Sequence, residues 1–134
     1  VMASSGTLVP LERIRARDCL LSGPAGGVVG AAKAASAAGF SKAIGVDMGG
    51  TSTDVCRIQD GIVPLSRKQT VGDATLLSPS AELVTVAAGG GSICSLDHTG
   101  MLCVGPASAG ANPGPACYGL GGPLTVLAPR QVPE

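Results

Sequence analysis

Residues 45–54 read GVDMGGTSTD, and this stretch constrains the fold more than any other part of the chain. Asp47 ends one apolar segment and Asp54 begins the next, with two adjacent glycines between them. Glycine permits a tight bend and leaves the surface of that bend free of Cβ atoms. A simple β-turn needs only one glycine and one Asn or Asp. The additional carboxylate and the three hydroxyls therefore raise the question of a bound ligand.

The spacing of these residues leaves two interpretations open. In the first, the amides of Gly50, Thr51 and Ser52 converge on an anion, and the Thr51 and Thr53 hydroxyls add donors. A carboxylate beside a phosphate needs a cation between them, so Asp47 implies Mg²⁺, held through water. In the second, the stretch is a glycine-rich hairpin turn whose Asp and Thr side chains cap their own backbone. The first interpretation requires an accessible Asp47 and an unobstructed bend.

The composition excludes several classes of partner. Lys plus Arg and Asp plus Glu both number 9, which argues against a nucleic-acid or anionic-membrane surface. The aromatic residues are Phe40 and Tyr118, too few for base stacking. The five irregularly spaced cysteines and the single histidine, His98, predict free thiols and no zinc site. No signal-like or membrane-spanning run is present, and we expect a cytoplasmic protein.

Three common site motifs are absent from the chain. G-x-x-x-x-G-K-[ST] and G-x-G-x-x-G do not occur, which disfavours a P-loop or a Rossmann nucleotide site. G-x-S-x-G is also missing, so the chain has no nucleophile elbow.

The first forty residues predict helical structure after a strand end or loop at Val1–Pro10. Leu11–Arg17 is expected to form two helical turns with Leu11 and Ile14 facing inward. A longer helix is expected to start at an N-cap on Ser22 and to stop at Gly39. Glycines 26, 27 and 30 disfavour that helix by about 1 kcal/mol each relative to alanine. Either close packing or an anion at the helix N-terminus offsets this cost.

The rest of the chain predicts a mainly antiparallel arrangement within one α/β unit. Its expected elements are a buried strand at Ala43–Val46, a strand at Thr53–Ile58, a hairpin turn at Asp60-Gly61, strands at Ile62–Thr70 and Glu82–Ala88, a hairpin over Ile93–Val104 that turns at Asp97–Gly100, and an ordered loop over Gly105–Gly122.

Three segments in this order resemble the hydantoinase A/5-oxoprolinase family of the actin-like ATPase superfamily. They are LSGPAGGVVGA (21–31), GVDMGGTSTDV (45–55), and VTVAAGGGSI (84–93) followed by VGPASAGANPGPACYGLGGPLTV (104–126). The resemblance implies an α/β, ribonuclease H-like (actin-like ATPase) half-domain with a β-hairpin phosphate loop. It makes residues 1–126 part of the second ATPase half and residues 127–134 a divergent C-terminal tail.

The activity that this resemblance implies is ATP-dependent opening of a cyclic amide, 5-oxoproline or a hydantoin, as in glutathione metabolism. ATP would phosphorylate the amide oxygen, and water would then complete ring opening. Asp47 would be the catalytic residue and would hold Mg²⁺. The residues expected to bind or shape the ATP site are Gly49, Gly50, Thr51, Thr53, Asp54, Gly89, Gly90, Gly91 and Ser92. Asn112 and Tyr118 are further candidates.

The chain also departs from the family pattern. It contains one D-x-G-G-T copy, whereas the superfamily builds its ATP site from two halves. We therefore expect a fragment that is inactive alone and that needs the missing halves of the enzyme or a hydantoinase B-type subunit. The alternatives are a non-catalytic nucleotide- or partner-binding module, which would show no hydrolysis, and a sugar-kinase-like phosphotransferase, against which the first and third segments count.

Overall fold

A computed structural model describes residues 1–71 and 73–127, which form two compact units. The first unit comprises Val1–Asp47 and Asp54–Val84, and the second contains Met48–Thr53 and residues 85–127. The α/β class is confirmed, but the expectation of one unit is wrong. The cluster of buried apolar residues lies in the first unit only, so it does not unite the whole chain. The expected tail at 127–134 lies outside the described residues except for Leu127.

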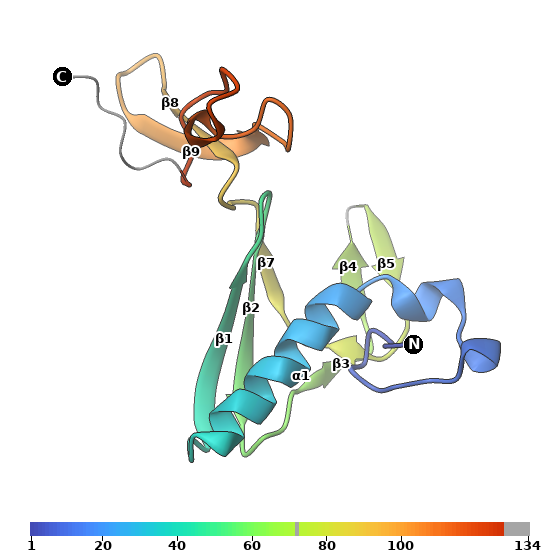
Figure 1. Ribbon diagram of the computed structural model, residues 1–134. Helices are drawn as coiled ribbons and strands as arrows, with labels where there is room; N and C mark the ends of the chain where they lie inside the picture. The colour runs from blue at the N-terminus through green and yellow to red at the C-terminus, as the bar shows by residue number, and fades with distance from the viewer. Residues whose placement is uncertain (72, 128–134) are drawn as a thin grey trace. The chain divides into compact units, whose positions relative to one another are not determined.

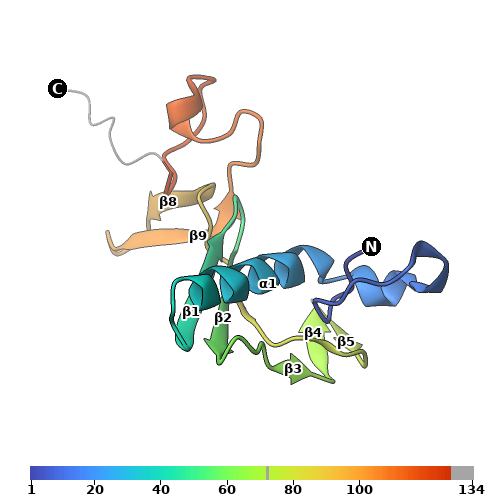
Figure 2. The ribbon, with the colours of Figure 1, turned by 60° about the horizontal axis from the view of Figure 1, so that its bottom comes forward.

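The first unit is built around helix α1 (Ser22–Ala37), which lies along one face of strands β1 (Lys42–Met48) and β2 (Thr53–Gln59) (Figures 1 and 2). The sheet order is β1-β2-β7, with β7 at Val84–Val86 inside the expected strand Glu82–Ala88. Val28 and Ala32 of the helix pack against Cys56 and Ile58 of β2. Burial of these small side chains holds the helix on the sheet.

The expected end of α1 is confirmed, whereas the expected N-cap is wrong. Gly39 has φ +80° and donates its amide to Ser36, as helix-terminating glycines do. At the other end, Leu21 takes the cap position and Ser22 is already helical. Leu21 donates its amide to the Ser4 hydroxyl at 3.0 Å, so an N-terminal residue contributes a capping interaction.

Strand β1 was expected to be buried, and its outer face is not. Ala43 and Gly45 face the helix, while Ile44 and Val46 are 72% and 65% exposed. Gly45 is required here because a Cβ would lie 2.7 Å from the Cys56 sulfur. The sequence of β1 is apolar on both faces, as in a strand covered on two sides, but the described residues cover one of them.

The hairpin turn predicted at Asp60-Gly61, directly after β2, is confirmed. The prediction of a single strand after this turn is wrong. Asp60 (φ 54°) and Gly61 (φ 71°) join a Gln59–Ile62 bridge, the geometry of a two-residue hairpin. The expected strand Ile62–Thr70 splits because the Ser66 hydroxyl accepts from the Lys68 amide and donates to its carbonyl, which turns the backbone.

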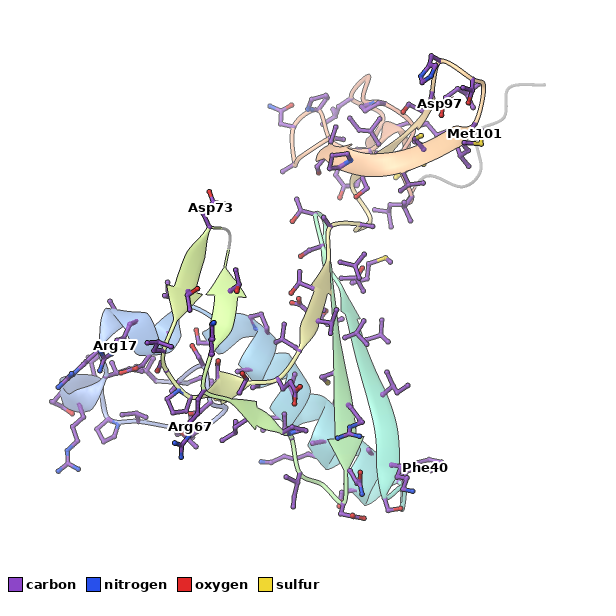
Figure 3. All side chains as sticks on the ribbon, turned by 180° about the vertical axis from the view of Figure 1, so that it is seen from behind. Arg17, Phe40, Arg67, Asp73, Asp97 and Met101 are labelled. Carbon is purple, nitrogen blue, oxygen red and sulfur yellow. The ribbon has the colours of Figure 1, made fainter. Side chains whose placement is uncertain are left out.

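The two halves of this segment pair with different partners. Strand β3 (Leu65–Ser66) pairs with β6 (Ser80–Ala81), and β4 (Gln69–Val71) pairs with β5 (Ala74–Leu76), both antiparallel. Figure 3 shows Asp73 at the tip of the β4–β5 hairpin.

The expected helix at Leu11–Arg17 is replaced by two 3₁₀ turns, η1 (Leu11–Arg13) and η2 (Ala16–Cys19). Leu11 is 71% exposed rather than inward-facing. Asp18 explains the break, because its carboxylate accepts from the Arg15 amide and from the Ser78 hydroxyl. Such local side-chain bonds compete with a regular helix. The segment before these turns is a loop closed by a Met2–Leu8 bridge, as expected.

The second unit contains the antiparallel hairpin of β8 (Ser92–Leu96) and β9 (Leu102–Ser108). The expected hairpin is confirmed, and Figure 3 shows Asp97 and Met101 at its turn. Strand β9 runs to Ser108, so the expected loop starts later than Gly105. That loop contains the 3₁₀ turn η3 (Ala116–Tyr118). No helix within residues 1–71 and 73–127 is long and apolar enough to cross a membrane.

The β8–β9 turn yields a prediction about acidity. The Asp97 carboxylate accepts from the Thr99 hydroxyl (2.6 Å) and from the Thr99 and Met101 amides, and these bonds hold its pKa below the ordinary value. A lowered pKa in the folded state stabilises the turn above the unfolded pKa, and this contribution is lost as pH falls through the folded pKa. We expect an NMR titration of the Asp97 carboxyl carbon to give a midpoint below that of the same residue in a short peptide; an equal midpoint would contradict these bonds.

Candidate phosphate site at the Gly-Gly turn

The Gly-Gly turn joins β1 to β2 and forms the tip of their hairpin. The Gly49 amide donates to the Ser52 carbonyl at 2.8 Å, which leaves Gly50 and Thr51 at the end of the loop. Gly49, Gly50 and Thr51 are exposed. A Cβ on Gly50 would meet no atom within 4 Å, so space remains for a ligand to approach this backbone.

The segment Gly89–Ser92 packs against the carbonyl side of the turn. The Gly90 amide donates to the Gly49 carbonyl at 2.8 Å, and the Gly91 amide donates to the Gly50 carbonyl at 2.7 Å. The Gly89 amide donates to the Ser92 hydroxyl, and the Ser92 amide donates to the Gly89 carbonyl. All four amides that we expected to form a second anion nest therefore have acceptors inside the chain.

The donors of the turn itself have no such acceptors. Within residues 1–71 and 73–127, no hydrogen bond is made by the amides of Gly50, Thr51 and Ser52, or by the Thr51 and Ser52 hydroxyls. Exposed, unpaired amides in a bent backbone are the feature of an anion-binding concavity. The bend is thus covered on its carbonyl side and open on its amide side.

Thr53 differs from the other hydroxyl residues of the turn. Its side chain is 8% exposed, and its hydroxyl donates to the Ala88 carbonyl at 2.6 Å. The expected phosphate donor is therefore engaged within the protein, and Thr53 ties the start of β2 to the chain just before Gly89.

The two carboxylates border one hollow in the first unit. Asp47 is exposed, Asp54 is half-buried, and both line a cavity of about 200 Å³ together with Pro24 and Gly27 of α1. A Cβ at Gly27 would lie 3.1 Å from the Asp47 Oδ2 atom, so this glycine lets the carboxylate approach the helix. A Cβ at Gly26 or Gly30 would meet no atom beyond their own helix backbone within 4 Å, so close packing accounts for Gly27 alone among the three.

The carboxylates of Asp47 and Asp54 suit Mg²⁺ better than they suit a metal ion that is held by protein ligands alone. The described residues contain no group of three or more His, Cys, Asp or Glu that could hold an ion. Mg²⁺ is commonly bound by one or two carboxylates, several waters and the phosphates of a substrate. Asp47 and Asp54 supply carboxylate oxygens of this kind. The five cysteines are free, as expected.

The proline-rich loop brings one of its two candidates to the turn. Tyr118 lines a cavity of about 380 Å³ with Gly49, Gly50 and Gly90. Its ring lies against Gly114, where a Cβ would come within 2.5 Å of it. Asn112 is exposed and does not line this cavity. His98 lies exposed at the β8–β9 turn.

The sequence reasoning missed two contributors. Ala88 accepts the Thr53 hydroxyl through its carbonyl, and Gly27 makes room for Asp47. Every residue has a backbone carbonyl, so the identity of residue 88 does not indicate that it accepts this hydrogen bond. The glycine cluster in α1 was a usable signal, but it did not show which glycine was needed.

A family model described as hydantoinase/oxoprolinase matches residues 1–127. The chain belongs to the hydantoinase/oxoprolinase family. A 5-oxoprolinase from Pestalotiopsis fici is 51% identical over 126 residues, which cover 93% of this chain and 10% of that relative. The chain therefore spans about a tenth of the length of this family member.

Two solved structures of the family share the fold. The ATP-dependent caprolactamase from Pseudomonas jessenii has a TM-score of 0.77 at 43% identity, with 93% of this chain and 18% of that chain covered. A nucleotide-free acetone carboxylase, described as carrying out ATP-dependent carboxylation, has a TM-score of 0.70 at 33% identity, with 82% and 16% covered. The resemblance of the three sequence segments to this family is confirmed.

Proposed function

We propose that this chain is the phosphate-binding part of an ATP-dependent hydrolase that opens a cyclic amide. The observation that supports the proposal most directly is the Gly-Gly turn. Among the described residues, the amides of Gly50, Thr51 and Ser52 have no acceptor, while the Gly49 and Gly50 carbonyls accept from Gly90 and Gly91. A bend of this kind in a family whose members include an ATP-dependent caprolactamase suits the phosphates of ATP.

In this proposal, the amides of Gly50, Thr51 and Ser52 bind phosphate oxygens. Asp47, two residues before Gly49, would hold Mg²⁺ through water, and Asp54, at the start of β2, would assist. When bound, the ion would neutralise negative charge on the phosphates. Gly49 supplies the bend, while Thr53 and Gly89–Ser92 hold the turn in shape rather than contact the phosphate. Tyr118 borders the same turn and remains a candidate contact.

The chemistry follows from the poor reactivity of an amide. An amide oxygen is a poor leaving group, and transfer of the γ-phosphoryl group to it makes a good one. The oxygen forms a bond to phosphorus as the bond to ADP breaks, and water then completes ring opening with release of phosphate. Exact placement of the phosphates by the turn would supply much of the rate enhancement.

A cyclic amide is favoured over a ketone as the substrate class. The 5-oxoprolinase and the caprolactamase are 51% and 43% identical to this chain, compared with 33% for the acetone carboxylase. Both of the first two names denote a lactam. We propose 5-oxoproline or a hydantoin as the substrate, in a cytoplasmic enzyme of glutathione metabolism.

The complete enzyme needs further polypeptide, because this chain spans 10% of the 5-oxoprolinase and 18% of the caprolactamase chain. The rest of the ATP site would come from the other half of the ATPase domain. A hydantoinase B-type partner would complete the hydrolysis.

Binding of phosphates at the turn can be tested on the 134-residue chain. We expect ATP·Mg and tripolyphosphate to shift the backbone amide resonances of Gly50, Thr51 and Ser52 in NMR titrations, because these amides have no acceptor within residues 1–71 and 73–127. AMP, which has no polyphosphate chain, serves as the control and should leave them in place. Shifts confined to other residues would contradict a phosphate site at this turn.

A further inference from the structure

We propose that the segment Ala88–Ser92 is a positioning element that aims the amides of the Gly-Gly turn, with the Thr53 hydroxyl as its anchor. The inference rests on the proposed binding of ATP phosphates at this turn. It assigns the glycine-rich segment a role different from the phosphate contact that its sequence suggests.

Peptide geometry connects the segment to the direction of the turn amides. In a trans peptide unit, the carbonyl of one residue and the N–H of the next point in opposite directions. The Gly49 and Gly50 carbonyls are bound by Gly90 and Gly91. The N–H groups of Gly50 and Thr51 must therefore point away from the Gly89–Ser92 segment, toward the side where the described residues place no acceptor. The hydrogen bonds that the Gly49 and Gly50 carbonyls accept therefore fix the direction of the Gly50 and Thr51 N–H groups.

The two backbones are too close for side chains at two of the three glycines. A Cβ at Gly89 would lie 2.6 Å from the Gly49 carbonyl oxygen, and one at Gly91 would lie 2.8 Å from that of Gly50. At Gly90, the nearest atom would be the Leu127 Cβ at 3.6 Å, an ordinary contact. The glycines thus permit a direct contact between backbones, which is stiffer than a contact through side chains.

Two hydroxyls hold the ends of the segment. Thr53 donates to the Ala88 carbonyl at 2.6 Å, and the Ser92 hydroxyl, in a side chain only 1% exposed, accepts the Gly89 amide at 2.9 Å. Thr53 also directly follows Ser52, the last residue of the turn with a free amide. The bond from Thr53 to Ala88 therefore adds a side-chain anchor to the two backbone hydrogen bonds that join the segment to the turn.

The test compares Thr53→Val, which keeps the shape but loses the hydroxyl, with Thr53→Ser, which keeps the hydroxyl. Calorimetry should show ATP·Mg bound about three- to tenfold more weakly by the valine variant, the range expected for loss of one hydrogen bond. The serine variant should stay within about twofold of the unaltered chain. Circular dichroism at the same temperature checks that each variant is folded, and its thermal midpoint measures the loss of stability separately.

The outcomes separate the positioning role from a structural one and from the proposed function. A lower thermal midpoint with unchanged affinity in Thr53→Val would overturn the positioning role alone. Failure of the unaltered chain to bind ATP·Mg would overturn the proposed function and this inference with it. If Thr53→Val does not fold, hydrogen exchange on the unaltered chain decides. The Gly90 and Gly91 amides should exchange more slowly once ATP·Mg is bound, and unchanged exchange would overturn the inference.

Discussion

The Asp47→Asn variant is expected to bind ATP·Mg about 10- to 100-fold more weakly than the unaltered chain, the loss typical when a group that orients a metal is removed. Its fold should be unchanged, because Asp47 is exposed and asparagine has nearly the same shape. Without magnesium the effect should vanish or reverse, since a carboxylate beside a phosphate is repulsive. Calorimetry with ATP, in the presence of magnesium and then of a chelator, measures both affinities.

Asp60→Asn is the matched control for this experiment. It removes the same charge at the other end of β2, in a turn whose positive φ asparagine tolerates. Its affinity for ATP·Mg should equal that of the unaltered chain. Equal losses in the two variants would indicate a general effect of charge, and unaltered binding by Asp47→Asn would remove this residue from the site.

The Gly89→Ala variant should lose about 1–3 kcal/mol of unfolding free energy, the usual effect of forcing extra atoms into a packed region. Its Cβ would lie 2.6 Å from the Gly49 carbonyl oxygen and 2.7 Å from the Ser52 nitrogen. Both are backbone atoms, so relief requires movement of the chain itself. Chemical denaturation followed by circular dichroism gives the change in unfolding free energy.

Gly90→Ala provides the comparison, because neither glycine has a positive φ and both gain the same methyl group. Its Cβ has room, and we expect a change within about 0.5 kcal/mol. If the two variants are equally stable, the close approach of Gly89–Ser92 to the turn is not maintained in solution.

Strong local signals made parts of the fold predictable. Asp60-Gly61 and Asp97–Gly100 carry turn chemistry that acts over four residues, and both turns are where the sequence places them. The break at Ser66 was missed because most serines in strands do not bond to their own backbone, and nothing in the sequence shows that the Ser66 hydroxyl bonds to Lys68. At Leu11–Arg17 the outcome depends on Ser78, sixty residues from Asp18, which local periodicity cannot include.

The sequence singled out the turn and its neighbours as a candidate site, but the hydrogen-bond partners of these residues could not be read from it. The accessible Asp47 and the free amides of the turn agree with the phosphate-loop interpretation. The roles of Thr53 and Gly89–Ser92 were harder to read, since a hydroxyl or a glycine amide can serve a ligand or its own backbone equally well. Only the direction of each donor separates these tasks, and that direction depends on long-range pairing.

The exposed outer face of β1 has a practical consequence for work with this chain. Ile44 and Val46 are exposed, and Ile44 borders a broad hollow together with Val84, Lys42 and Arg57. The formal charge of the chain is zero, so copies meet no net repulsion in solution. We therefore expect concentrated samples to aggregate through the exposed apolar face of β1. Dye binding or light scattering should be measured before every titration.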